Sequence, residues 1–343
     1  MPKSRPRRAA AAKIVPRAKI MRAALSHGRE SASAVLEERG KTLASGTGQS
    51  GLLIAEGDSW FDYPGDDVLA ILEDNYGYRV ESVAHHGDTI ESMAYDSTQL
   101  TKLARAFEHV KQDGREPRAI LLSGGGNDIA GDEFAVLLNH AASGLPPLNP
   151  RVVEGILDER LRFAIGSVIG AVTELSQRLF GRKTPVLIHG YAHPVPDGRG
   201  YLGGFWFLPG PWLRPGFSAK GYEDRKRCCD IVEDLIDRFN EVVQSIAGSN
   251  GFEHVSYVDV RPLLSNELPT AYRKSWDNEL HPTDAGYALI AKKFDDTIRQ
   301  VAPLTIGGGP RVPRATTSGP PGELARPKKA GRVPARPRRR RSR

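Results

Sequence analysis

The sequence predicts a doubly wound α/β fold with helices on both faces of a five-stranded parallel sheet. Between about residue 52 and residue 300, short apolar runs alternate with longer stretches of helical periodicity, which is the pattern of strands joined by crossover helices. Polar or glycine-rich turns follow several of these runs, at the end of the strands where open parallel sheets bind ligands. Five such strands favour a flavodoxin-like three-layer α/β/α arrangement with the strand order 2-1-3-4-5.

Each expected strand is a short apolar run bounded by turn residues, and each expected helix has apolar residues at helical spacing. The first strand, GLLIAE, ends at Gly57, and the polar residues Asp58 and Ser59 follow it. The strands are expected at 51–56, 78–84, 118–124, 185–191 and 254–260, and the helices at 66–77, 89–112, 151–181, 226–248 and 283–301.

The chain of 343 residues divides into three parts by charge. Residues 1–29 carry nine Lys and Arg and no acid, and residues 311–343 carry twelve Lys and Arg and one acid, so the net charge of +7 leaves −13 for the middle. We therefore predict a basic, partly helical N-terminal extension over 1–50, the α/β domain over 51–302, and a disordered Pro- and Arg-rich tail over 303–343. Two interpretations of the tail remain open: contact with nucleic acid or an anionic surface, and a solvated segment.

Composition also bears on location. There is no apolar run of about 18 residues, so no transmembrane segment is expected. The two cysteines, Cys228 and Cys229, are adjacent and offer no disulfide framework. The default expectation is a cytoplasmic protein.

Four residue types that acyl transfer requires follow separate expected strands. Ser59 follows the first strand, Gly87 the second, Asn127 the third, and His281 lies beyond the fifth. A serine nucleophile needs a base within hydrogen-bond reach and donors for a developing oxyanion. Each residue alone has a structural explanation, such as a helix cap or a turn glycine, but their arrival at one edge of a parallel sheet favours a catalytic site.

The same blocks resemble those of the SGNH (GDSL-type) hydrolases: Gly57-Asp58-Ser59, Gly87, the GGND stretch at 125–128, and His281-Pro282. The resemblance covers roughly residues 51–300 and implies a flavodoxin-like hydrolase that cleaves small-molecule esters or thioesters through an acyl-enzyme, without a metal or another cofactor. By position, it implies that Ser59 is the nucleophile and His281 the general base. It also implies an oxyanion hole made by the backbone amides of Ser59 and Gly87 and by the Asn127 side chain.

The last block departs from the family pattern, in which an aspartate precedes the histidine by three residues. Asn278 occupies that place here. An asparagine can accept the imidazole N–H but has no charge to stabilise an imidazolium. We favour Asp277 as the third member of the triad, with Asn278 or a main-chain carbonyl as alternatives.

The substrate pocket is expected to include residues beside the four blocks and residues of a long Pro-, Gly- and aromatic-rich loop at 194–218, which we interpret as a lid or a substrate wall, with packing over the core as the alternative. Its aromatic residues fit an acyl chain or a sugar equally well. The expected pocket residues are Asp58, Trp60, His86, Tyr191, His193, Trp206 and Trp212.

Two other functions compete with the esterase interpretation. A metal-dependent phosphoesterase would need ligands at the strand ends, with Asp58, His189 and His193 among the candidates, but Ser59 and the GGND turn do not fit that chemistry. The alternative we retain is a non-catalytic binding protein on the same scaffold, tethered by its basic tail to nucleic acid or an anionic surface.

Overall fold

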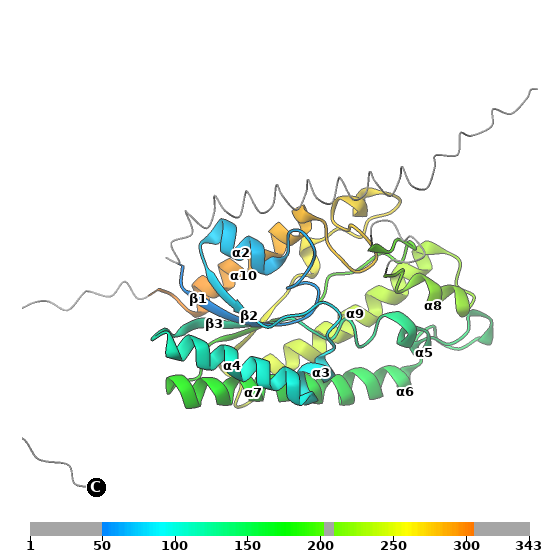
Figure 1. Cartoon of the computed structure of the whole chain (residues 1–343). Helices are drawn as coiled ribbons and strands as arrows, with labels where there is room; N and C mark the ends of the chain where they lie inside the picture. The colour runs from blue at the N-terminus through cyan, green and yellow to red at the C-terminus, as the bar shows by residue number, and fades with distance from the viewer. Residues whose placement is uncertain (1–49, 202–208, 305–343) are drawn as a thin grey trace, which may run out of the picture. The chain divides into compact units, whose positions relative to one another are not determined.

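A computed structural model describes residues 50–201 and 209–304, which contain one sheet of five parallel strands. The strand order β2-β1-β3-β4-β5 confirms the predicted fold and topology (Figure 1). The strands are β1 (Leu52–Glu56), β2 (Arg79–Ser82), β3 (Pro117–Leu122), β4 (Val186–His189) and β5 (Val255–Val258).

The burial of the central strands explains why they appear as apolar runs in the sequence. Every residue of β1 and β4 is buried, whereas the edge strand β2 carries exposed residues such as Arg79. A parallel strand that is covered on both faces needs apolar side chains on both sides. The register pairs Glu56 with Leu122, so β1 and β3 end side by side and the turns that follow them leave the same edge of the sheet.

Helices cover both faces of the sheet (Figure 1). On one face of the sheet, α2 (Val68–Tyr76) packs against α10 (Asp284–Val301). The opposite face is covered by α4 (Ser97–Gln112), α7 (Arg162–Phe180) and α9 (Arg225–Ala247).

The helix expected at 89–112 is divided into α3 (Ile90–Tyr95) and α4. Asp96 lies between them with an extended backbone, and its carboxylate accepts hydrogen bonds from the N–H groups of Thr98 (2.6 Å) and Gln99 (3.1 Å). An N-cap aspartate satisfies donors that a continuous helix would satisfy internally. The capping energy of Asp96 therefore competes with helix continuation and turns the chain.

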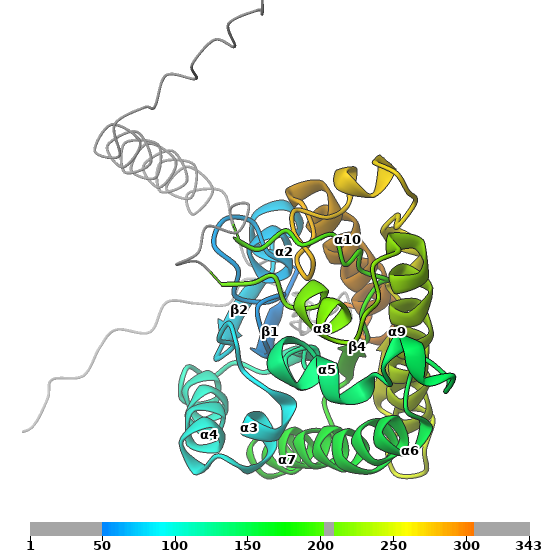
Figure 2. The same cartoon turned by 90° about the vertical axis from the view of Figure 1, so that its right-hand side faces the viewer.

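The stretch expected as one helix at 151–181 is continuous but irregular. It begins as α6 (Pro150–Val153), passes through a π-helical segment at Glu154–Leu161, and continues as α7. Two further short helices, α5 (Phe134–Leu137) and α8 (Arg214–Ala219), contact each other on the side of the molecule that faces the viewer in Figure 2.

The predicted N-terminal extension at 1–50 and tail at 303–343 lie almost wholly outside the described residues, as does Trp206. Both remain predictions. Within 50–201 and 209–304, no helix combines the length and the apolar character needed to cross a membrane. Cys228 and Cys229 are free thiols, both buried.

Candidate active site

The turn after β1 is fixed by buried contacts. Gly57 has no space for a side chain, because a Cβ there would lie 2.8 Å from both Phe61 and Ser123. The next residue, Asp58, is 2% exposed, and its carboxylate accepts hydrogen bonds from the Ser123 hydroxyl (2.7 Å), the Trp60 N–H (3.0 Å) and the Tyr191 hydroxyl. The Gly-Asp pair thus holds the backbone of this turn.

The side chain of Ser59, the expected nucleophile, points from this turn toward His281. Its Oγ lies 2.9 Å from the Nε2 atom of His281, which is hydrogen-bond distance for a serine and its general base. The imidazole is 6% exposed and lies between two aromatic rings: Tyr63 stacks on it at a centroid distance of 4.3 Å, and Trp212 meets it edge-on at 5.4 Å. Burial lowers the pKa of His281 to about 3, so the ring is neutral at physiological pH.

The residue that faces the other imidazole nitrogen is Asn278. Its Oδ1 lies 2.9 Å from Nδ1 of His281 and also accepts the N–H groups of Leu280 and His281, both at 3.0 Å. Because Oδ1 can only accept, Nδ1 carries the ring proton and Nε2 is free to accept one from Ser59. The preference for Asp277 is therefore corrected by the geometry: the alternative, Asn278, touches the imidazole.

Asp277 hydrogen-bonds to Asn278 and Tyr63, the two residues that contact the imidazole of His281. Its carboxylate accepts hydrogen bonds from the Asn278 side-chain amide (3.3 Å) and the Tyr63 hydroxyl (3.4 Å). The same amide donates to the Tyr63 oxygen at 3.0 Å. Burial raises the pKa of Tyr63, so its hydroxyl remains a donor. Together these contacts fix which end of the Asn278 amide faces the histidine.

Besides the Ser59 amide on the turn after β1, the expected oxyanion donors lie on the turns after β2 and β3. Gly87 has φ of +87°, in the left-handed region that glycine tolerates. The Asn127 side chain donates to the carbonyl of Asp88 at 2.9 Å, and since an amide has two N–H groups, the second can serve a substrate. Asp128 accepts the Ile90 N–H at 2.8 Å. The GGND turn therefore holds the Gly87 turn and presents its own donor beside it.

The sequence model of the GDSL-like lipase/acylhydrolase family matches residues 43–289 of this chain. The chain belongs to that family. It is an ester hydrolase of the SGNH type, as the four sequence blocks implied.

Comparison with solved structures gives two esterases among the similar folds. The psychrotrophic esterase EstA from Pseudoalteromonas sp. is 13% identical with a TM-score of 0.40, over 73% of this chain and 97% of that one. An acetylxylan esterase from Geobacillus stearothermophilus is 15% identical with a TM-score of 0.38, over 72% and 93% of the two chains. No curated protein matches the chain.

A cavity that is partly open to solvent includes the candidate nucleophile of this hydrolase in its lining. Ser59 and Asn127 line this cavity, and residues of α9 line it as well. Of the expected pocket residues, Asp58, Trp60 and Tyr191 line this cavity.

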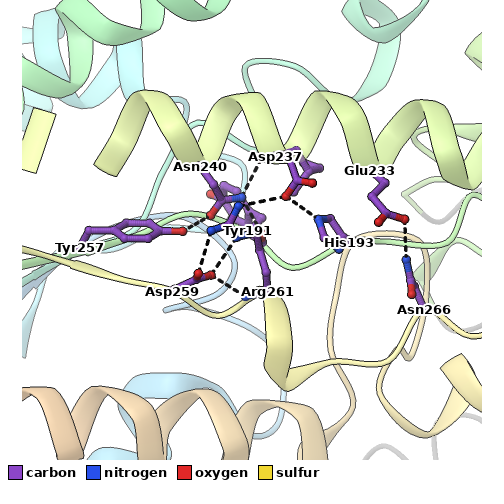
Figure 3. Close-up of polar contacts among 10 residues, drawn as sticks. Tyr191, His193, Glu233, Asp237, Asn240, Tyr257, Asp259, Arg261 and Asn266 are labelled. Atoms are coloured by element: carbon purple, nitrogen blue, oxygen red, sulfur yellow. Dashed lines mark hydrogen bonds and ion pairs between the residues drawn. The ribbon is translucent and has the colours of Figure 1, made fainter. Parts of the chain in front are cut away.

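Three expected pocket residues lie elsewhere. Trp212 covers the imidazole of His281. The His86 side chain is 64% exposed, and its Nδ1 lies 2.9 Å from Asp62 at the outer rim. His193 lies in the polar network of Figure 3, where its Nε2 is 2.9 Å from Asp237 of α9. Its neighbours Ala192 and Pro194 line the cavity instead, as expected where side chains alternate along extended backbone.

Within residues 50–201 and 209–304, one cluster of side chains around His193 has the residue types of a metal site. Ligand atoms of His193, Glu233 and Asp237 lie within 4.8 Å of one another. The Asp237 oxygen that faces His193 also accepts a hydrogen bond from Arg261 at 3.0 Å (Figure 3). A guanidinium in that position opposes a second cation, and the cluster is explained as an ion-pair network between α9 and the segment after β5.

Glu279 is a positioning residue beside the site that the sequence does not single out. It is fully buried, and its carboxylate accepts the N–H groups of Gly198 (2.9 Å), Trp212 (2.7 Å), Leu213 (2.7 Å) and Arg214 (3.1 Å). Burial raises its pKa, against the lowering effect of these donors. The carboxylate fastens the described ends of the 194–218 loop to the turn that carries His281.

His189 and Ser123 form a buried layer beneath the nucleophile turn. His189 Nε2 lies 2.8 Å from the Ser123 hydroxyl, which donates to Asp58, and Trp60 stacks on the His189 ring at 5.2 Å. Burial lowers the pKa of His189. The signal for both residues was present, since each stands at or just after the end of a central strand.

Proposed function

We propose that this hydrolase cleaves carboxylic esters or thioesters through an acyl-enzyme on Ser59. The observation that supports this most is the hydrogen-bond chain from Ser59 Oγ through His281 to Asn278, with 2.9 Å at each step. A neutral imidazole with its proton on Nδ1 is in the protonation state that a general base requires.

In the first half-reaction, the Ser59 oxygen attacks the substrate carbonyl while its proton moves to His281 Nε2. The carbonyl oxygen becomes an oxyanion, which the amides of Ser59 and Gly87 and the Asn127 side chain stabilise. Collapse of this intermediate breaks the bond to the alcohol or thiol, and His281 returns the proton to that leaving group. Ser59 is left acylated.

In the second half-reaction, a water molecule gives its proton to His281 and attacks the acyl-enzyme. The released acid takes the acyl group, and the proton returns to Ser59. No step requires a metal ion. Asn278 orients the imidazole without carrying charge, and the Asp277 carboxylate behind it supplies negative potential over a longer distance.

The test combines labelling with turnover. A fluorophosphonate probe should modify Ser59, identified by peptide mass spectrometry, and Ser59→Ala should lose both labelling and hydrolysis of p-nitrophenyl esters. A chelator should leave turnover unchanged. Full activity of the alanine variant would exclude the serine mechanism, and activity lost to a chelator and restored by Mn²⁺ or Zn²⁺ would indicate a metal enzyme.

If the parent chain hydrolyses neither oxyesters nor thioesters, the alternative is favoured: a binding protein on the same scaffold. Contact of residues 311–343 with nucleic acid or an anionic surface and a cytoplasmic location are further predictions, based on charge and on the unpaired cysteines.

A further inference from the structure

The cavity at Ser59 and the enclosure of His281 are lined by different residues. Ser59 and Asn127 line the cavity together with Trp276 and Leu280, whereas His281 is not among its lining residues. His281 is instead enclosed by Tyr63 and Trp212. The two sides of a bound ester carbonyl therefore meet different surroundings.

The chemistry assigns a substrate half to each side. His281 must deliver a proton to the leaving oxygen or sulfur, so the alcohol or thiol half lies on the side of the imidazole and Trp212. The carbonyl oxygen points to the oxyanion donors, of which Asn127 is one. The remaining substituent of the carbonyl, the acyl chain, is directed into the cavity.

The walls of the cavity are apolar. Phe134, Leu213 and three residues of α9, Val232, Leu235 and Ile236, contribute to them, and each is 6% exposed or less. The α9 residues recur at a spacing that puts them on one face of the helix.

One charged group, Asp58, lies in the wall. Its carboxylate is already occupied by the Ser123 and Tyr191 hydroxyls and by the Trp60 N–H. With these contacts and only 2% of the residue exposed, little of the carboxylate is open to sugar hydroxyls. The walls favour a chain that gains by leaving water.

We propose that this cavity is an acyl pocket and that the substrates are esters of uncharged, aliphatic acids longer than acetate. The inference rests on the proposed serine mechanism and adds the substrate class. It resolves the choice between an acyl chain and a sugar in favour of the acyl chain.

The first experiment compares p-nitrophenyl acetate, butyrate, hexanoate and octanoate. A fully buried methylene contributes about fourfold in binding, so burial of two to three of the six methylenes that octanoate adds to acetate should raise kcat/KM by about 30-fold. Xylose tetraacetate should be a poor substrate. An optimum at acetate, or preference for the acetylated sugar, would overturn the acyl pocket.

A matched pair of variants then tests whether the chain-length preference comes from this cavity. Ile236 and Ile246 are both on α9 and both 6% exposed, but only Ile236 lines the cavity. Ile236→Trp should reduce the ratio of kcat/KM for octanoate over acetate by about tenfold, whereas Ile246→Trp should preserve the ratio. A second variant at this position, Ile236→Ala, should shift the optimum of kcat/KM to longer acyl chains.

Two outcomes separate this inference from the proposed function. If all three variants keep the parent ratio while Ser59→Ala abolishes turnover, the pocket assignment is wrong and the serine mechanism stands. If the fluorophosphonate probe fails to label Ser59 and no ester is cleaved, the proposed function itself is wrong.

Discussion

The two halves of the candidate active site are built in different ways. Ser59, Gly87 and Asn127 stand in turns that follow β1, β2 and β3, so the parallel ladder sets their positions. His281 lies in the irregular segment between β5 and α10, which individual hydrogen bonds hold: Trp60 Nε1 donates to the Leu280 carbonyl at 3.0 Å, and Arg199 donates to the Asp277 carbonyl at 2.5 Å. The strand-end half matches the family pattern, and the histidine half departs from it at Asn278.

The difference shows where a site can change its chemistry. A turn between a buried strand and a helix offers few alternatives, because a side chain on Gly57 would collide with Phe61 and Ser123. In the histidine half, Tyr63 and Asp277 hold an amide where the family has an acid. A network of side chains outside the regular elements can therefore carry a substitution that the strand ends cannot.

The largest expected effect tests whether the halves act as one unit. Ser59→Ala and His281→Ala should each lower kcat by about 10⁴- to 10⁶-fold, and the double variant should be little worse than either, because nucleophile and base act in the same step. Single-turnover kinetics with p-nitrophenyl esters provide the measurement, with circular dichroism as the control for folding. Independent, multiplicative losses would contradict a shared step.

Asn127→Ala tests the strand-end half alone. If the amide is an oxyanion donor, kcat should fall by roughly 10²- to 10³-fold with little change in KM. The matched control is Asn139→Ala, since Asn139 also donates to a backbone carbonyl, that of Pro146, in an exposed setting. A rise in KM at unchanged kcat would make Asn127 a binding residue.

In the histidine half, the direct contact of Asn278 with His281 should matter more than the nearby charge of Asp277. Asn278→Ala should lower kcat about 10- to 100-fold because a buried N–H loses its acceptor, and Asp277→Asn should cost less than about tenfold. Equal or reversed losses would return the orienting role to Asp277.

Asn278→Asp gives the pH signature of the same contact. The parent imidazole, with a pKa near 3, should remain a competent base down to about pH 4. A carboxylate at 278 stabilises the imidazolium and raises that pKa, so the acid limb of kcat/KM should move to higher pH. Identical profiles for the parent and the variant would show that position 278 does not face the ring.

The smallest effect is expected from the tail. Deleting residues 311–343 removes +11 from a chain of +7 and leaves −4. Hydrolysis of a neutral ester should stay within about twofold, whereas any affinity for nucleic acid or anionic vesicles should fall and should weaken with salt in the parent. Loss of turnover on deletion would place the tail in the site.

The sequence was sufficient for the sheet and for the placement of Ser59, Gly87 and Asn127 after its strands, because buried parallel strands carry a strong apolar signal and the turns that follow them are short. The sequence was insufficient where two adjacent residues compete for one contact. Asp277 and Asn278 are neighbours in an irregular segment, and only the backbone path determines that Asn278 faces His281. The outward direction of His193 was accessible in principle, since the flanking Ala192 and Pro194 alternate with it.

The four main-chain donors on Glu279 also have a consequence for local unfolding. Opening the described ends of the 194–218 loop would leave a buried carboxylate without partners, and releasing the turn that carries His281 would do the same to the loop amides. The two segments should therefore open as one cooperative unit. In native-state hydrogen exchange, the amides of Gly198, Trp212 and Leu213 should share one opening free energy with the amide of His281. Glu279→Gln should lower that free energy for all four amides together.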